Sequence, residues 1–98
     1  MHSYFVYIPT NKNKTVLYTG ITNDLHRRLL EHEKSAIPLK SNAFAGRYNA
    51  YFLIFYERFK NVDNAIAREK EIKGWRREKK EALIKTLNPE WKFLNDEV

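Results

Sequence analysis

Runs of apolar residues near the start of the chain predict two β-strands. The first run, Tyr4 to Ile8, is rich in aromatic and β-branched residues and stops at Pro9, as a strand would. The polar segment Asn11 to Lys14 separates it from a second run, Thr15 to Thr19, which ends at Gly20. Two strands joined by so short a polar turn are predicted to form a hairpin.

The predicted hairpin brings two tyrosines together if it is symmetric about its polar turn. Tyr7 then lies directly across from Tyr18 on the same face of the sheet, unless a bulge changes the register. For either tyrosine alone, packing in the core is the simpler interpretation, because Tyr is common in strands and the chain has six.

The middle of the chain predicts a helix followed by a long connection. Thr22 or Asn23 can cap a helix that begins near Asp24, whose carboxylate suits the positive end of the helix dipole, and that runs to about Lys34. From Ser35 to Asn49 there is no clean periodicity. A connection of this length usually moves or binds something, so it is a candidate substrate loop.

The second half of the chain opens with a strand and a helix. Ala50 to Tyr56 is almost continuously apolar, which indicates a central strand that is buried on both faces. Asn61 or Asp63 can cap a helix that extends to about Lys73, and Gly74 is its predicted end.

A third helix and an apolar tail complete the predicted order ββαβαα. The helix spans about Arg76 to Leu87 and is ended by Asn88-Pro89. The fold class is therefore α/β or α+β, with a three-stranded mixed or antiparallel sheet flanked by helices, in a single domain over residues 1–98. The tail residues that we expect to pack back on this domain are Trp91, Phe93 and Leu94.

Composition narrows the classes of function. The 98 residues are 43% apolar and 14% aromatic, which is enough for one compact core. No apolar run approaches the ~20 residues of a membrane span and the N-terminus lacks the plan of a secretion signal, so we expect a soluble, cytoplasmic protein without membrane contact. The chain contains no cysteine, which excludes disulfides, thiolate metal sites and cysteine catalysis. Any metal ion must be held by carboxylates, histidines or water.

The net charge suggests a class of partner. Eighteen Lys and Arg against twelve Asp and Glu give +6, which suits a polyanion. A well-solvated basic surface explains the same charge equally well. The positions of particular side chains must decide between the two, and the oligomeric state stays open.

The first predicted helix separates two neighbouring arginines. On a helical wheel, Arg28 and His32 flank the buried stripe that contains Leu25 and Leu29, whereas Arg27 falls near the opposite side. Arg27 should therefore be solvated and Arg28 partly buried. From the helix alone, the commoner interpretation is that Arg28 lays its stem along the core and extends its charged end into solvent.

The second predicted helix carries a carboxylate on its apolar face. A similar wheel places Glu69 near Ile72 and turns Glu71 the other way. Burying Glu69 without a cation would be costly. A metal ion and an internal salt bridge, with Arg28 or Arg68 as the partner, explain this position equally well.

Taken together, these side chains match what hydrolysis of a phosphodiester requires. The reaction needs a group that orients or deprotonates water, a cation for the developing charge and an oxygen ligand for a hard metal ion. Two tyrosines, a half-buried arginine, a histidine one turn on and an interior glutamate can supply them.

The chain resembles the GIY-YIG nuclease superfamily in several ordered blocks. Phe5-Val6-Tyr7 and Tyr18-Thr19-Gly20 are similar to the two half-motifs that name the family, at the usual separation. Gly20 to His32 resembles the segment that runs into the catalytic arginine helix, and Ala65 to Trp75 resembles the block with the metal-binding glutamate. With the ending Asn88 to Trp91, the likeness covers nearly the whole chain and is greatest to small stand-alone bacterial-type members.

The resemblance implies an endonuclease that binds nucleic acid, DNA in the first place, and hydrolyses phosphodiester bonds with Mg²⁺ or Mn²⁺. It assigns Tyr7 and Tyr18 to activation and positioning of water, Arg28 to stabilisation of the phosphate and Glu69 to the metal ion. His32 is expected to assist one of the tyrosines. Tyr7 is the preferred general base and Tyr18 the alternative, and either needs its pKa lowered from about 10.

Other roles stay open at the level of sequence. A late asparagine of some family members has two candidate counterparts, Asn88 and Asn95, and is not assigned. Two further classes of function remain: a binding module of the same fold without turnover, and a protein-interaction domain that uses the helix carrying Arg76 and Arg77. The residues expected to contact nucleic acid, most of which would otherwise be solvated surface charges, are Gly20, Lys40, Arg47, Arg76, Arg77, Lys79 and Lys80.

Overall fold

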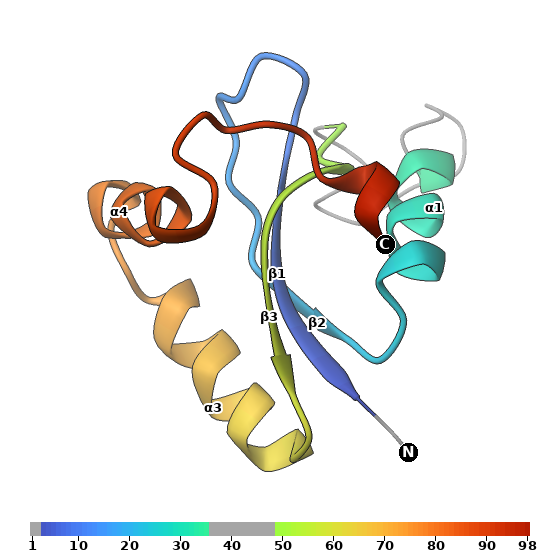
Figure 1. Ribbon diagram of the computed structural model, residues 1–98, viewed down its shortest axis with the longest axis vertical. Coiled ribbons are helices and arrows are strands. Elements are labelled where there is room, and N and C mark those ends of the chain that lie inside the picture. Colours follow the sequence, from blue (N-terminus) through green and yellow to red (C-terminus); the bar gives the residue numbers. More distant parts are fainter. Residues whose placement is uncertain (1–2, 36–48) are drawn as a thin grey trace.

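The computed structural model describes residues 3–35 and 49–98 (Figure 1). The elements in chain order are β1 (Tyr4–Thr10), β2 (Gly20–Thr22), α1 (Leu25–Ser35), β3 (Phe52–Phe59), α3 (Val62–Lys73), α4 (Arg77–Leu87) and a short 3-10 helix, η1 (Asn95–Glu97). This order confirms the predicted succession ββαβαα. Within the described residues, no helix has the length and apolar character needed to cross a membrane.

The three strands form an antiparallel sheet in the order β2-β1-β3. The central strand is therefore β1, and the prediction that the strand at residues 50–56 is central was wrong. Leu53, Ile54 and Phe55 of β3 are indeed buried, but helices rather than a second neighbouring strand cover them. A continuous apolar run indicates that both faces of a strand are buried. It does not indicate whether both edges of the strand pair with other strands.

The hairpin was predicted in the wrong register. Regular pairing resumes only at β2, where Gly20 and not Tyr18 lies opposite Tyr7. Before it, the predicted second strand contributes one isolated bridge, between Leu17 and Thr10. The observed register differs from the predicted one by two residues. Because successive side chains point to opposite faces of a strand, Tyr18 still lies on the predicted face.

A local feature of the turn accounts for the shifted register between β1 and β2. The side-chain Oδ1 of Asn11 accepts hydrogen bonds from the backbone N–H groups of Thr15 and Val16 at 2.8 and 3.0 Å, which enlarges the turn. On the other edge of β1, which continues through Pro9, a separate bulge between Ile8 and Pro9 shifts the register with β3. Neither feature appears in an apolar pattern.

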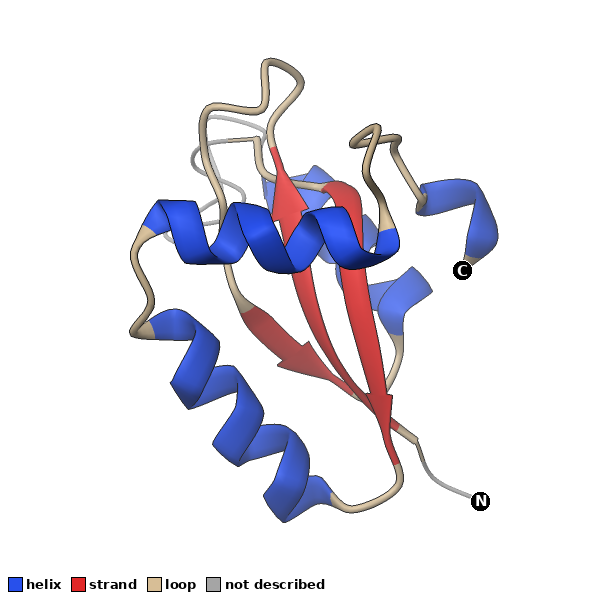
Figure 2. Ribbon diagram, turned by 60° about the vertical axis from the view of Figure 1, so that its left-hand side comes forward, coloured by secondary structure: helices blue, strands red, loops and turns tan. Residues whose placement is uncertain are grey.

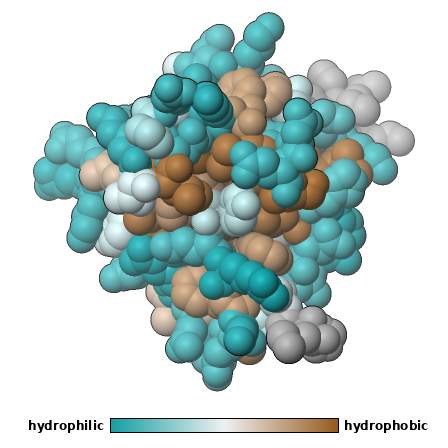
Figure 3. Space-filling view, viewed as in Figure 1, coloured by the Kyte–Doolittle hydropathy of each residue, from teal (hydrophilic) through white to brown (hydrophobic). Residues whose placement is uncertain are grey.

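The helices lie in two layers on either side of the sheet. Figure 2 shows α4 crossing in front of the strands, α3 beside them at the lower left and α1 behind them. Val6, Ile8, Ile54, Ile72 and Ile84 form the core beneath α3 and α4. A second core lies beneath α1, and its buried members are Tyr7, Leu25, Leu29, Leu53 and Leu94. On the face seen in Figure 3, apolar side chains reach the surface only in patches among hydrophilic ones.

Local caps set the ends of two helices. Asn61 caps α3, as one of the two predicted caps, by accepting from the N–H groups of Asp63 and Asn64, and Gly74 ends the helix as predicted. At α1 the predicted caps were wrong. The side-chain Oδ1 of Asp24 accepts from the N–H of Arg27 at 3.1 Å, so Asp24 itself closes the first turn.

Candidate active site

Tyr7 stands at the centre of the sheet face beneath α1, and its side chain is fully buried. Its ring lies directly over Gly20 on the neighbouring strand. A Cβ atom at Gly20 would lie 2.8 Å from Cε1, Cζ and the hydroxyl oxygen of Tyr7, closer than real Cβ atoms approach. Glycine is therefore needed at this position to leave room for the ring.

His32 holds the hydroxyl group of Tyr7. The Tyr7 oxygen and Nε2 of His32 are 2.7 Å apart, and His32 is almost entirely buried one helical turn beyond Arg28. Burial, reinforced by the positive charge of Arg28, lowers the pKa of His32 to about 4. His32 is thus neutral near pH 7, so Nε2 can accept the hydroxyl proton of Tyr7.

Arg28 also lies close to the hydroxyl oxygen of Tyr7. The nearby hydroxyl group of Tyr7 raises the pKa of the Arg28 guanidinium above its usual value. Arg28 also lies 3.6 Å from the carboxylate of Glu31. Arg27, by contrast, is exposed and donates to Asn23 at 3.0 Å, so the predicted difference in burial between the two arginines is confirmed. Arg28 therefore does more than extend into solvent.

Tyr18 approaches the same cluster and keeps more contact with solvent. Its ring meets that of His32 edge-on, with centroids 5.7 Å apart, while Tyr7 stacks on His32 at 5.9 Å. Tyr18 is half-buried. The structure thus brings four of the predicted site residues together on one face of the sheet: Tyr7, Tyr18, Arg28 and His32. The two tyrosines share that face, as predicted.

The two tyrosines differ in their fitness as a base. Burial raises the pKa of Tyr7 to about 12, although Arg28 acts in the opposite direction. A general base near neutral pH needs a lowered pKa, and Tyr7 has the reverse. This environment argues against the predicted preference for Tyr7.

Glu69 lies in the other helical layer, on α3, which packs against β1 and the edge strand β2. Its side chain is 13% exposed, which confirms the predicted interior position. The carboxylate pairs with Lys73 at 3.2 Å, one turn along the same helix. The predicted salt-bridge partners were wrong, because Arg68 binds Glu57 and Glu71 instead and Arg28 lies in the cluster at Tyr7.

Glu69 is suited to a metal ion only as a single protein ligand. Among the described residues, no three His, Asp or Glu side chains gather where they could hold a metal together. A carboxylate that retains access to solvent, paired only with a lysine that is 57% exposed, still fits Mg²⁺, which commonly takes one or two carboxylates and keeps several waters.

Basic side chains gather where α3 meets α4, around the half-buried Trp75. The ammonium of Lys79 lies 4.4 Å and the guanidinium of Arg68 5.3 Å from the centre of the indole ring. Burial and the nearby charge of Lys73 lower the pKa of Lys80. We call the set Lys73, Trp75, Arg76, Lys79 and Lys80 the basic corner.

The remaining predicted contacts have different outcomes. Gly20 is buried beneath Tyr7. Arg77 directs its guanidinium to carbonyl oxygens of the β1–β2 connection, which weakens both its role as a phosphate contact and a protein-interaction surface built on it. Lys40 and Arg47, together with most of the candidate substrate loop, lie outside the described residues.

The two asparagines considered for a catalytic role both brace the tail. Asn88 is buried and donates to the carbonyl oxygens of Ile54 and Lys92 at 3.0 and 2.8 Å. Asn95 accepts from the N–H of Leu53 and donates to the carbonyl of Tyr51. Through these bonds the tail packs against β3, as predicted. Three of these partners, Ile54, Leu53 and Tyr51, lie more than thirty residues away in sequence, beyond the reach of any local pattern.

Comparison with known proteins agrees with this geometry. Residues 3–82 match the model of the GIY-YIG catalytic domain. A UPF0213 protein of Natronomonas pharaonis is 33% identical over 83% of this chain and 89% of its own. A UPF0213 protein of Staphylococcus aureus is 32% identical over 87% of this chain and 98% of its own. The solution structure of a Bacillus halodurans UPF0213 protein superposes with a TM-score of 0.56 at 28% identity, over 91% of this chain and 89% of that one.

Proposed function

Because the chain belongs to the GIY-YIG family, whose members are nucleases, we propose that it is a metal-dependent endonuclease that hydrolyses phosphodiester bonds in DNA. The observation that carries this proposal is the cluster at Tyr7, where Arg28, His32 and Tyr18 meet on one face of the sheet. A buried hydroxyl held between an arginine and a neutral histidine is more than a folding core requires.

Glu69 would hold the metal ion, Mg²⁺ or Mn²⁺. When bound, the ion would polarise a phosphoryl oxygen and lower the pKa of attacking water. When no metal ion is bound, Lys73 neutralises the carboxylate of Glu69. The Lys73 side chain is largely exposed and can turn away into solvent. The edge strand β2 connects the two parts of the site, since α3 packs against it and its Gly20 lies beneath Tyr7.

Arg28 would stabilise the charge that grows on the phosphoryl oxygens. Its raised pKa keeps it cationic over the whole working range, and its contact with Tyr7 holds the guanidinium in place before substrate binds. A preorganised cation of this kind costs little rearrangement during the reaction.

Tyr18 would serve as the general base, and Tyr7 as a support. The support for this assignment is that Tyr7 is fully buried with its pKa raised to about 12, whereas Tyr18 is only half-buried. His32 would fix the orientation of Tyr7 by accepting a hydrogen bond from its hydroxyl group. In this arrangement Tyr7 and His32 position Arg28.

The basic corner would contact the phosphate backbone. Lys73 links it to Glu69, so a strand lying on these charges would pass the metal ligand. The indole of Trp75 is covered by cations rather than open to a base, which favours contacts to phosphates without reading of sequence.

Cleavage of a mixed panel tests the proposal. Labelled duplex, branched and single-stranded DNA would be incubated with the protein in Mg²⁺, in Mn²⁺ and in excess chelator. We expect cleavage of at least one substrate that stops when the metal is removed. Cleavage that persists in chelator would refute metal dependence. If no substrate is cleaved under any condition, the proposal that the protein is an endonuclease is refuted.

A binding module without turnover is the second candidate, and one observation favours it. Lys73 already neutralises Glu69, so a metal ion must compete with an internal ion pair. DNA binding that weakens with salt, without cleavage in either metal, would identify this alternative.

A further inference from the structure

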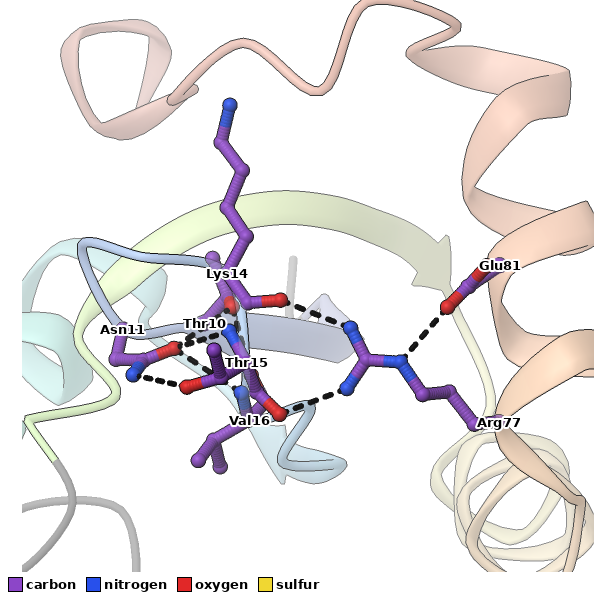
Figure 4. Close-up of polar contacts among 7 residues, drawn as sticks. All are labelled: Thr10, Asn11, Lys14, Thr15, Val16, Arg77 and Glu81. Carbon is purple, nitrogen blue, oxygen red and sulfur yellow. Dashed lines mark hydrogen bonds and ion pairs between the residues drawn. The ribbon is translucent and has the colours of Figure 1, made fainter.

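Arg77 reaches from the start of α4 to the connection between β1 and β2. Its Nη1 donates to the carbonyl oxygen of Thr15 and its Nη2 to that of Lys14, both at 2.8 Å (Figure 4). Its Nε donates to the carboxylate of Glu81 at 2.7 Å. Each guanidinium nitrogen therefore has a partner, and the planar fork spans two consecutive carbonyl groups.

The connection held in this way has little regular structure of its own. Between the strands it is paired through one bridge at Leu17 and through the N–H of Tyr18, which donates to the carbonyl of Pro9 at 3.1 Å. Lys14 takes a left-handed backbone conformation with φ of 59°, which is unfavourable for a residue with a side chain. Such a conformation persists only where its surroundings impose it.

Two sets of contacts impose it from opposite sides. Asn11 binds the N–H groups of Thr15 and Val16 from within the turn, and its Nδ2 donates to the Thr15 hydroxyl at 2.7 Å. Arg77 binds the carbonyl groups from outside, across more than sixty residues of sequence. Figure 4 shows the connection between these two side chains. Without Arg77, two adjacent carbonyl groups would lose their protein partner.

Tyr18 lies at the end of this connection. It follows Thr15 by three residues, precedes β2, and places its ring against His32. The place of its ring therefore depends on the shape of the connection as well as on the pairing of Leu17 and Tyr18 with β1. A displacement of about 1 Å of a reacting group can cost on the order of 10² in rate.

We propose that Arg77 is a positioning residue that sets the place of Tyr18 at the active site by clasping the carbonyl groups of Lys14 and Thr15. The consequence for turnover rests on the proposed function. In this proposal Arg77 acts through the connection rather than on a phosphate, because all three guanidinium nitrogens already donate to protein oxygens. Lysine cannot replace it, because a single ammonium keeps the charge but cannot span both carbonyl groups in one plane.

Arg77→Lys separates positioning from phosphate binding. DNA affinity would be measured in Ca²⁺ and the single-turnover rate at saturating protein in Mg²⁺. We expect the rate to fall about tenfold or more and the affinity to change less than about twofold, because charge is kept and geometry is lost. The matched control is Arg58→Lys, an exposed arginine that donates to the hydroxyl of Ser3, and it should leave both unchanged. Reduced affinity with an unchanged rate would make Arg77 a phosphate contact and overturn the proposal.

A second measurement does not depend on cleavage. NMR spectra of ring-labelled tyrosine would be recorded for the wild type, Arg77→Lys and Arg58→Lys. We expect the Tyr18 signals to shift only in Arg77→Lys, with those of Tyr56 on β3 unchanged. Unmoved Tyr18 signals would overturn the proposal. If the wild-type protein cleaves nothing, the proposed function fails, and the Tyr18 signals still decide whether Arg77 positions this ring.

Discussion

Tyr7 and Gly20 show how closely single residues are matched in this fold. The ring fills the space that a side chain at Gly20 would occupy, and its hydroxyl is held by Arg28 and His32. The phase of the first helix predicted the partial burial of Arg28, because helical periodicity is a local property. The contact between Tyr7 and Gly20 was not predicted, because it depends on a register set by the turn.

Gly20→Ala should destabilise the fold. The added methyl group would meet the Tyr7 ring at 2.8 Å, and His32 prevents that ring from moving freely. We expect a loss of about 1–3 kcal/mol in the free energy of unfolding, measured by urea denaturation. Gly74→Ala is the matched control: its methyl group would lie 3.6 Å from the nearest atom at a φ of −81°, so stability should be unchanged or slightly higher. Equal losses would show that Tyr7 does not depend on the small size of Gly20.

The buried state of His32 predicts a stability that depends on pH. Its pKa falls from 6.5 when unfolded to about 4 in the fold, so the unfolded chain binds more protons between these values. The free energy of unfolding should therefore decrease as pH falls from about 6.5 to 4, by roughly 2–3 kcal/mol. Urea denaturation across this range would measure the slope. His32→Gln should flatten it and His26→Gln, at an exposed position of the same helix, should not; equal slopes in both variants would assign the effect to other groups.

The helices and the strands of this chain differ in how far sequence predicts them. The bounds of α3 follow from Asn61 and Gly74, whose capping action is local, and both were predicted. The sheet was predicted in strand number and chain order but not in register or strand position. The β1–β2 register is set by side-chain bonds of Asn11 within the turn, and the β1–β3 register changes at the bulge beside Pro9. The turn is also contacted by Arg77 of α4, which is too distant in sequence for a local pattern to reveal.

Glu69→Gln tests the role of α3 in the site. The substitution keeps side-chain volume and removes the charge, so the fold should be retained while metal-dependent cleavage is lost. Stopped cleavage assays in Mg²⁺ and circular dichroism would measure the two effects. Glu71→Gln, at an exposed position of the same helix, should cleave as the wild type does. Retained cleavage in Glu69→Gln would remove this residue from the mechanism.

At the scale of the whole molecule, the proposed site residues lie on both sides of the sheet. Arg28, His32 and the tyrosines belong to the α1 side of the sheet, and Glu69 with the basic corner belongs to the α3 and α4 side. Composition alone left nucleic-acid binding and a solvated basic surface equally open, and the gathering of lysines beside Glu69 is what favours binding.

DNA binding should weaken steeply with salt, because each neutralised phosphate releases counterions. The logarithm of the association constant for duplex DNA, measured in Ca²⁺ by fluorescence anisotropy, should fall linearly with the logarithm of salt concentration. Lys79→Ala should reduce the slope by about 1, whereas Lys85→Ala, at an exposed position near the end of α4, should leave it unchanged. A slope that does not change with salt would contradict contact with a polyanion.

The central claim is that Arg28 acts on the reacting phosphate, and single-turnover cleavage of one labelled DNA by Arg28→Ala and Arg27→Ala tests it most directly. Both variants would first be shown to be folded by circular dichroism. We predict that Arg28→Ala lowers the rate by about 10² or more, roughly 3 kcal/mol in activation free energy, with affinity little changed. Arg27→Ala, on the exposed side of the same helix, should cleave at nearly the wild-type rate. Equal losses, or a larger loss in Arg27→Ala, would contradict the assignment of the active site.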